Sequence, residues 1–91
     1  MNELALQQDI DTVSALVRRV ASDGACPAQL TEATRFVEDV GMESINRLML
    51  MTLLEQEFGI NLEQHMSTLV ELHTIGATAR FIHALREGQQ P

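Results

Sequence analysis

The feature that most constrains this chain is the helical spacing of its apolar residues. In the first twenty positions they recur three or four residues apart: Leu6, Ile10, Val13, Val17 and Val20. Polar and charged residues fill the positions between them. This 3.6-residue period predicts an amphipathic helix over about residues 3–21. The Asp23-Gly24 pair and Pro27 follow it directly, and such residues break helices.

A second helix is predicted over about residues 44–58, with Gly59 as its C-terminal cap. Eight of its fifteen residues are apolar: Ile45, Leu48, Met49, Leu50, Met51, Leu53, Leu54 and Phe58. At 100° per residue these positions lie nearly all round the helix, whereas a surface helix needs an apolar stripe only about 100° wide. The helix is therefore either fully enclosed or shows apolar side chains to a partner.

A chain of 91 residues is short for enclosing one helix on every side. We therefore expect an exposed apolar patch that includes Leu48 and Met49. On this interpretation Leu50, Leu54 and Phe58 point inward. The alternative, in which all eight side chains are core, stays open at this point.

The remaining segments predict two more helices. A short third helix begins either near Glu63 or at Thr68, where Glu71 would complete a capping box. Thr74 is expected to be the N-cap of a last helix, which ends at Gly88.

No strand-like alternation competes with these helices, so the predicted fold class is all-α. We expect a four-helix bundle with three longer helices, one short third helix and a long first loop. That loop has apolar residues and should pack them onto the helices. The chain is expected to form one domain over residues 1–91, with a core of about residues 4–87 and a flexible tail over 88–91.

Composition excludes several classes of function. Thirteen acidic residues against six arginines and no lysine give a net charge of −7, which disfavours nucleic acid and favours partners with basic faces. The longest apolar run is too short to span a membrane, and the start "MNELALQQDI" lacks the basic residues of a signal peptide. The single cysteine, Cys26, is read as an ordinary loop residue of a reducing compartment. We expect a cytoplasmic monomer.

Residues for catalysis or metal binding are poorly arranged. His65, His73 and His83 are eight and ten residues apart, so no pair has the spacing of two ligands on one helical face. Ser44 lies in "GMES", which is not the G-x-S-x-G elbow of a hydrolase. We therefore expect neither a metal site nor an enzyme.

Ser44 lies at the predicted start of the second helix and has two interpretations. As an N-cap it would contribute about 1 kcal/mol, but Arg47 stands three residues on, where a capping box has Glu or Gln. A basic residue in the first turn also opposes the helix dipole. A phosphate ester on this serine would instead lie near free N–H donors and the positive end of the dipole.

The stretch "FVEDVGMESI" at residues 36–45 resembles the F-x-x-D-L-G-x-D-S-L motif of the acyl carrier proteins. The stretch "LEQEFGINL" at residues 54–62 is similar to the L-E-E-E-F-x-I-x-I motif of the same family. The resemblance covers about residues 6–86 and has the same order of elements.

The resemblance implies a carrier, not a catalyst. It implies that a separate Mg²⁺-dependent phosphopantetheinyl transferase joins 4'-phosphopantetheine from coenzyme A to Ser44 through a phosphodiester. The thiol of this arm then carries acyl groups as thioesters to ketosynthase, acyltransferase or ligase partners. The expected partner-docking residues are those around the attachment point and along the second helix: Glu43, Ile45, Arg47, Leu48, Met49 and Glu55.

The chain departs from the family motif at several positions. Glu43 and Ile45 replace the usual aspartate and leucine, and Arg47 dilutes the acidic surface of the second helix. We expect Arg47 to be exposed and to affect partner recognition more than stability. These changes favour a specialised polyketide or fatty-acid-like pathway. Alternatives are a peptidyl or D-alanyl carrier, or an unmodified helical interaction module.

Overall fold

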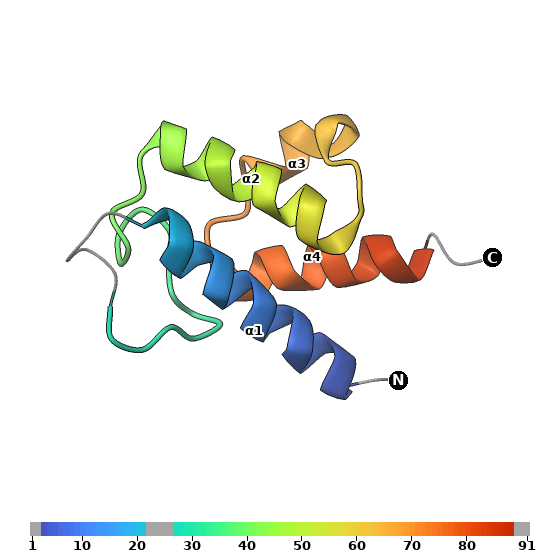
Figure 1. Cartoon of the computed structure of the whole chain (residues 1–91), viewed down its shortest axis with the longest axis horizontal. Helices are drawn as coiled ribbons and strands as arrows, with labels where there is room; N and C mark the ends of the chain where they lie inside the picture. Colours follow the sequence, from blue (N-terminus) through green and yellow to red (C-terminus); the bar gives the residue numbers. More distant parts are fainter. Residues whose placement is uncertain (1–2, 22–26, 89–91) are drawn as a thin grey trace.

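The computed structural model describes residues 3–21 and 27–88, which are helical apart from their connections (Figure 1). The elements are α1 Glu3–Val20, α2 Ser44–Phe58, the 3₁₀ turn η1 Glu63–His65, α3 Met66–Leu69 and α4 Ile75–Gly88. No β-strand occurs in these ranges, although one isolated bridge pairs Arg35 with Thr74. The predicted all-α class, with three longer helices and a short third one, is confirmed.

Two expectations fall partly or wholly outside the described residues. Cys26 and residues 89–91 of the expected tail are not described. Gly88, which we assigned to that tail, is instead the last residue of α4.

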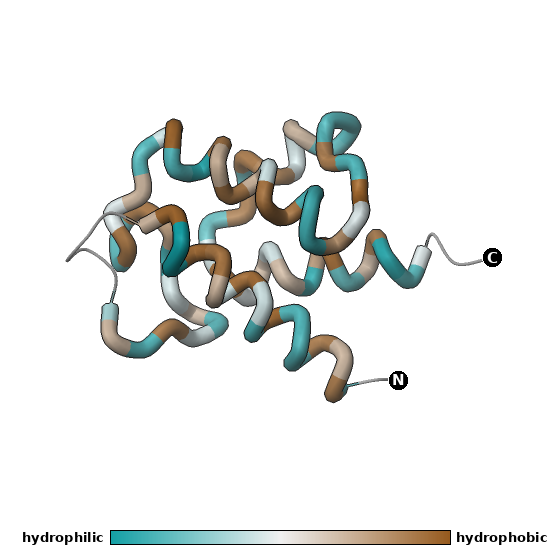
Figure 2. Tube along the Cα trace, in the orientation of Figure 1, coloured by the Kyte–Doolittle hydropathy of each residue, from teal (hydrophilic) through white to brown (hydrophobic). Residues whose placement is uncertain are grey.

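The core forms where α1 packs against α4 and α2. Its central side chains come from the apolar stripes of three helices: Ile10, Val13, Leu16, Val17 and Val20 from α1, Leu50 and Leu54 from α2, and Ile75, Ala79 and Ile82 from α4. Figure 2 shows apolar and polar residues alternating along α1, as its predicted period requires.

The long first loop packs most of its apolar residues into this core, as expected, whereas Val37 is 52% exposed. Phe36, Val40 and Met42 are all at most 5% exposed. Two backbone bonds tie the loop to the start of α4: the Phe36 N–H donates to the His73 carbonyl (2.9 Å), and the Ile75 N–H donates to the Thr34 carbonyl (3.1 Å). The loop therefore delivers the chain to the start of α2 along a fixed path.

A turn at residues 35–41 completes this path. The Asp39 carboxylate accepts the Arg35 backbone N–H (2.8 Å) and a bond from its guanidinium (3.2 Å). Both hydrogen bonds from Arg35 lower the pKa of Asp39, the side-chain bond more than the backbone bond. Gly41, with φ 76°, then supplies a backbone conformation that other residues rarely adopt.

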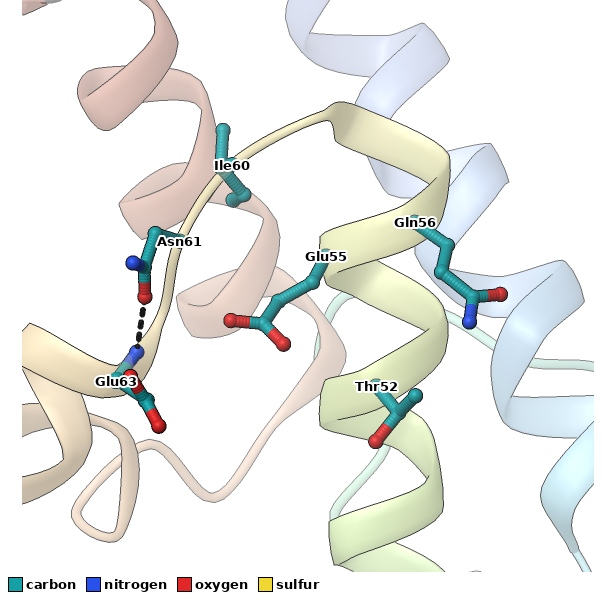
Figure 3. Close-up of a pocket in the computed structure, with 6 residues that line it drawn as sticks. All are labelled: Thr52, Glu55, Gln56, Ile60, Asn61 and Glu63. Carbon is teal, nitrogen blue, oxygen red and sulfur yellow. Dashed lines mark hydrogen bonds between the residues drawn. The ribbon is translucent and has the colours of Figure 1, made fainter.

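The third helical segment was predicted to begin either near Glu63 or at Thr68, and the structure shows the first of these starts. The chain turns helical at Glu63, whose N–H bonds the Asn61 side chain (2.9 Å, Figure 3). The proposed capping box of Thr68 with Glu71 is wrong, because Thr68 lies inside α3. The Thr74 cap is confirmed, since its hydroxyl accepts the Ala77 N–H (3.1 Å).

A buried carboxylate joins α1 to α4. Asp9 is 4% exposed, and its oxygens contact Arg86 Nη1 at 2.6 Å and His83 Nδ1 at 3.0 Å. The Arg86 guanidinium also lies 5.3 Å from the centre of the Phe58 ring of α2. Because a buried charge is costly without partners, these contacts fix how the two helices pack.

The Asp9→Asn variant tests this contact. It removes the charge that Arg86 and His83 share, so the free energy of unfolding should fall by about 1–3 kcal/mol in urea denaturation. Asp11→Asn, on the exposed side of the same helix, is the control and should change stability by less than about 0.5 kcal/mol. Equal stability of the two variants would show that the Asp9 cluster does not hold the bundle together.

Candidate functional site

Ser44 is the first residue of α2, and Glu43 is its N-cap. The Glu43 backbone is extended, with φ −94° and ψ 173°, as N-cap residues usually are. Our alternative in which Ser44 caps the helix is therefore wrong. The Ser44 side chain is exposed, and no residue in the described ranges hydrogen-bonds its hydroxyl. This hydroxyl is open to modification.

The side chain that completes the capping box belongs to Asn46, three residues after the N-cap Glu43. Its Oδ1 accepts the Glu43 N–H (3.0 Å), and its Nδ2 donates to the Val20 carbonyl at the end of α1 (3.0 Å). One side-chain amide thus joins the start of α2 to the end of α1. The role of Asn46 was not predicted, because a cap at Glu43, one residue before Ser44, moves the paired position from Arg47 to Asn46.

The helix start suits a phosphate ester on Ser44. The first N–H groups of a helix lack acceptors within the helix, and the helix dipole places partial positive charge there. An exposed serine oxygen at the first helical position would hold a phosphate close to both. The residues present therefore fit a phosphodiester-linked group.

Ser44 opens onto a groove between α2 and α3. The groove has a volume of about 220 Å³. Four apolar side chains line it, Leu48, Met51, Met66 and Val70, together with Ser44 and Arg47. Leu48 is 53% exposed and Val70 is 52% exposed. We call this the α2–α3 groove.

The exposed apolar patch predicted on α2 is confirmed. Ile45, Leu48 and Met49 are each about half exposed or more, at 61%, 53% and 48%. Leu50 and Leu54 are buried and point inward as expected, whereas Phe58 is only half-buried. The alternative in which all eight apolar residues are core is wrong. The patch places three of the expected docking residues on the surface of α2.

Glu55 lies away from this patch. It is eleven residues beyond Ser44, or about 16 Å along the helix axis, and lines an open hollow at the far end of α2 (Figure 3). It is half-buried, and its Oε2 accepts the Leu62 N–H at 2.7 Å. This carboxylate therefore anchors the turn into η1, and the structure does not bring it to the Ser44 groove.

Arg47 is half-buried, so the expectation that it is exposed is wrong. Its Nη2 donates to the carbonyl of Leu69, the last residue of α3 (3.3 Å), and to that of Leu72, three residues further on (3.2 Å). Its guanidinium also lies 5.9 Å from the centre of the Phe36 ring. Arg47 thus attaches the α3 segment to α2, and we now expect its substitution to lower stability as well as to affect partner recognition.

Other chemistry is sparse in the described ranges. Residues 3–21 and 27–88 contain no group of three His, Cys, Asp or Glu side chains placed to hold a metal ion. His83 is bound to Asp9, and His65 packs edge-on against Phe81 with 5.4 Å between ring centres. Among the helices of these ranges, none has the length and apolar character needed to cross a membrane.

Asn46→Ala tests the link between the two helices. It removes both bonds of the amide, so the free energy of unfolding should fall by about 1–2 kcal/mol in urea denaturation. Gln56→Ala, an exposed position on the same helix, is the control and should stay within about 0.5 kcal/mol of wild type. If Asn46→Ala is as stable as Gln56→Ala, the amide does not join the helices as described.

Arg47→Ala tests the structural role of this side chain. It leaves the Leu69 and Leu72 carbonyls without their donor, so the unfolding free energy should fall by about 1–3 kcal/mol. Arg19→Ala is the matched control, since Arg19 is exposed and should change stability by less than about 0.5 kcal/mol. If Arg47→Ala lowers the free energy of unfolding no more than Arg19→Ala does, Arg47 does not hold the α3 segment in place.

Comparisons with known proteins agree with this geometry. Residues 11–82 match the family described as "Phosphopantetheine attachment site", so the match covers nearly all of the 91 residues. No solved structure matches the chain. Members of this family hold a 4'-phosphopantetheine group covalently. The chain belongs to the phosphopantetheine-attachment family and is a carrier protein of the acyl carrier type.

Proposed function

We propose that this chain is an acyl carrier protein whose Ser44 bears the 4'-phosphopantetheine arm. The observation that carries the proposal is the exposed, unbonded Ser44 hydroxyl at the first residue of α2, beside the α2–α3 groove. The family match supplies the chemistry of the group, and this hydroxyl offers the accessible oxygen for its phosphodiester. When bound, the arm supplies a thiol on which acyl groups are held as thioesters.

The protein itself is proposed to carry out no catalysis. A serine nucleophile needs a base within hydrogen-bond reach, and in the described ranges no side chain bonds the Ser44 hydroxyl. A hydrolase built on Ser44 is therefore unsupported. The activation of this hydroxyl is assigned to a separate phosphopantetheinyl transferase.

We propose that partners dock on the exposed patch of α2, which comprises Glu43, Ile45, Leu48 and Met49. Glu43 and Ile45 flank Ser44 in sequence, and Leu48 lines the α2–α3 groove with it, whereas Met49 faces the α1 side of the helix. All four are exposed, three of them with apolar side chains. Apolar contact would give most of the affinity, while the net charge of −7 would speed encounter with basic partners. Arg47 and Glu55 would act on docking mainly through the segments that they hold in place.

The pathway is proposed to be a specialised one, of the polyketide or fatty-acid-like type. Support comes from the apolar docking patch and from the low acidity of α2, which has only Glu55 and Glu57 within its bounds. Such a surface would select synthase enzymes that recognise apolar side chains more than charge.

Ser44→Ala tests the attachment directly. After incubation with coenzyme A, Mg²⁺ and a broad-specificity phosphopantetheinyl transferase, the wild type should gain one phosphopantetheinyl group by intact mass. Ser44→Ala should gain none, because the phosphodiester needs the serine oxygen. Ser67→Ala, which alters another exposed serine, is the matched control and should be loaded like the wild type.

Two outcomes would overturn the proposal. One is a wild type that stays unmodified while an unrelated carrier in the same reaction is loaded, which would favour an unmodified interaction module. The other is a Ser44→Ala variant that still gains the group.

A further inference from the structure

We propose that Arg47 binds the phosphodiester of the arm on Ser44 and so directs the arm into the α2–α3 groove. This inference rests on the proposed attachment at Ser44. It assigns a role to an arginine whose position in the first helical turn is unfavourable for the helix alone.

The placement of the two residues supports this role. Ser44 and Arg47 are three residues apart on α2, so their side chains share one face of the helix. Both line the α2–α3 groove together with apolar side chains of α2 and α3. A phosphate on the Ser44 oxygen would therefore lie at the same groove as the guanidinium.

Arg47 still has hydrogen-bond donors to offer. Its contacts with the Leu69 and Leu72 carbonyls both use Nη2, which leaves Nε and Nη1 without acceptors in the described ranges. No buried side-chain nitrogen or oxygen in those ranges lacks a hydrogen-bond partner. Nε and Nη1 of Arg47 must therefore reach solvent. A guanidinium with these donors free can bind phosphate oxygens through two bonds.

The charge of Arg47 also has no counter-ion among residues 3–21 and 27–88. In the same ranges three other arginines are paired with carboxylates: Arg35 with Asp39, Arg80 with Glu32 and Arg86 with Asp9. Arg47 has only neutral carbonyl acceptors and the Phe36 ring, although Glu43 lies one turn before it. A phosphodiester would bring the missing negative charge to the groove.

The guanidinium is already held in position before the arm is attached. Two carbonyls and one aromatic ring fix it, so binding a phosphate costs little further side-chain entropy. From the phosphate, the arm would run along the apolar side chains of Leu48, Met66 and Val70. The thiol end would thus be presented beside the docking patch instead of moving freely in solvent.

The test is NMR of the arginine side chains in ¹⁵N-labelled protein, before and after loading. Each arginine gives one Nε–Hε signal, and that of Arg47 is identified by its loss in Arg47→Lys. On loading of the wild type, this signal should shift downfield because Nε gains a phosphate acceptor. The signals of Arg35 and Arg80, which are paired elsewhere, should stay in place.

A second readout follows the path of the arm. Loading should shift the backbone amide signals of Met66 and Val70 in the wild type, and in Arg47→Gln these shifts should shrink to the level seen at the distant Gln56. Intact mass establishes loading before any spectrum is compared, so a failure to load counts against Ser44 attachment alone. An unchanged Arg47 signal in fully loaded wild type would overturn the inference while leaving the attachment intact.

Discussion

The position of Ser44 depends on one side-chain amide. Asn46 bonds the Val20 carbonyl at the end of α1 and the Glu43 N–H at the start of α2 at once, and Val20 lies 26 residues before Asn46 in sequence. The intervening loop is tied to α4 by backbone bonds of Phe36 and Ile75. The amide acts at the first turn of α2, and the backbone bonds act on the loop that leads to it, so Ser44 lies at a fixed, exposed place on a small bundle. A carrier needs this arrangement, since its partners must find the attachment point on a rigid surface.

The helices could be predicted from the sequence because their apolar spacing is regular. The bounds of α2, its Gly59 cap and the burial of Leu50 and Leu54 all follow from local pattern. The exposed patch could be predicted from the number of apolar residues in α2, because a short chain has too little other structure to enclose a helix that is apolar on every side. These properties depend on residues near one another in sequence, which explains why they could be read without a structure.

The roles of the polar side chains could not be predicted in the same way. Arg47 bonds carbonyls 22 and 25 residues away, and Asp9 meets His83 and Arg86 across the whole chain. Such contacts depend on which helices pack together. The sequence pattern predicts exposure for a charged residue on a helix, because it does not show a partner that is distant in sequence. The N-cap shifted by one residue for a related reason: the extended Glu43 backbone is set by the loop that precedes it, which has no regular period.

The central claim is that Ser44 carries the phosphopantetheine arm, and peptide mapping of the loaded wild-type protein tests it most directly. Trypsin cleaves after Arg35 and Arg47 and releases residues 36–47, in which Ser44 is the only residue with a hydroxyl side chain. We expect the whole added mass on this peptide, and fragmentation should place it on Ser44. An added group found on any other peptide of loaded protein would contradict the account.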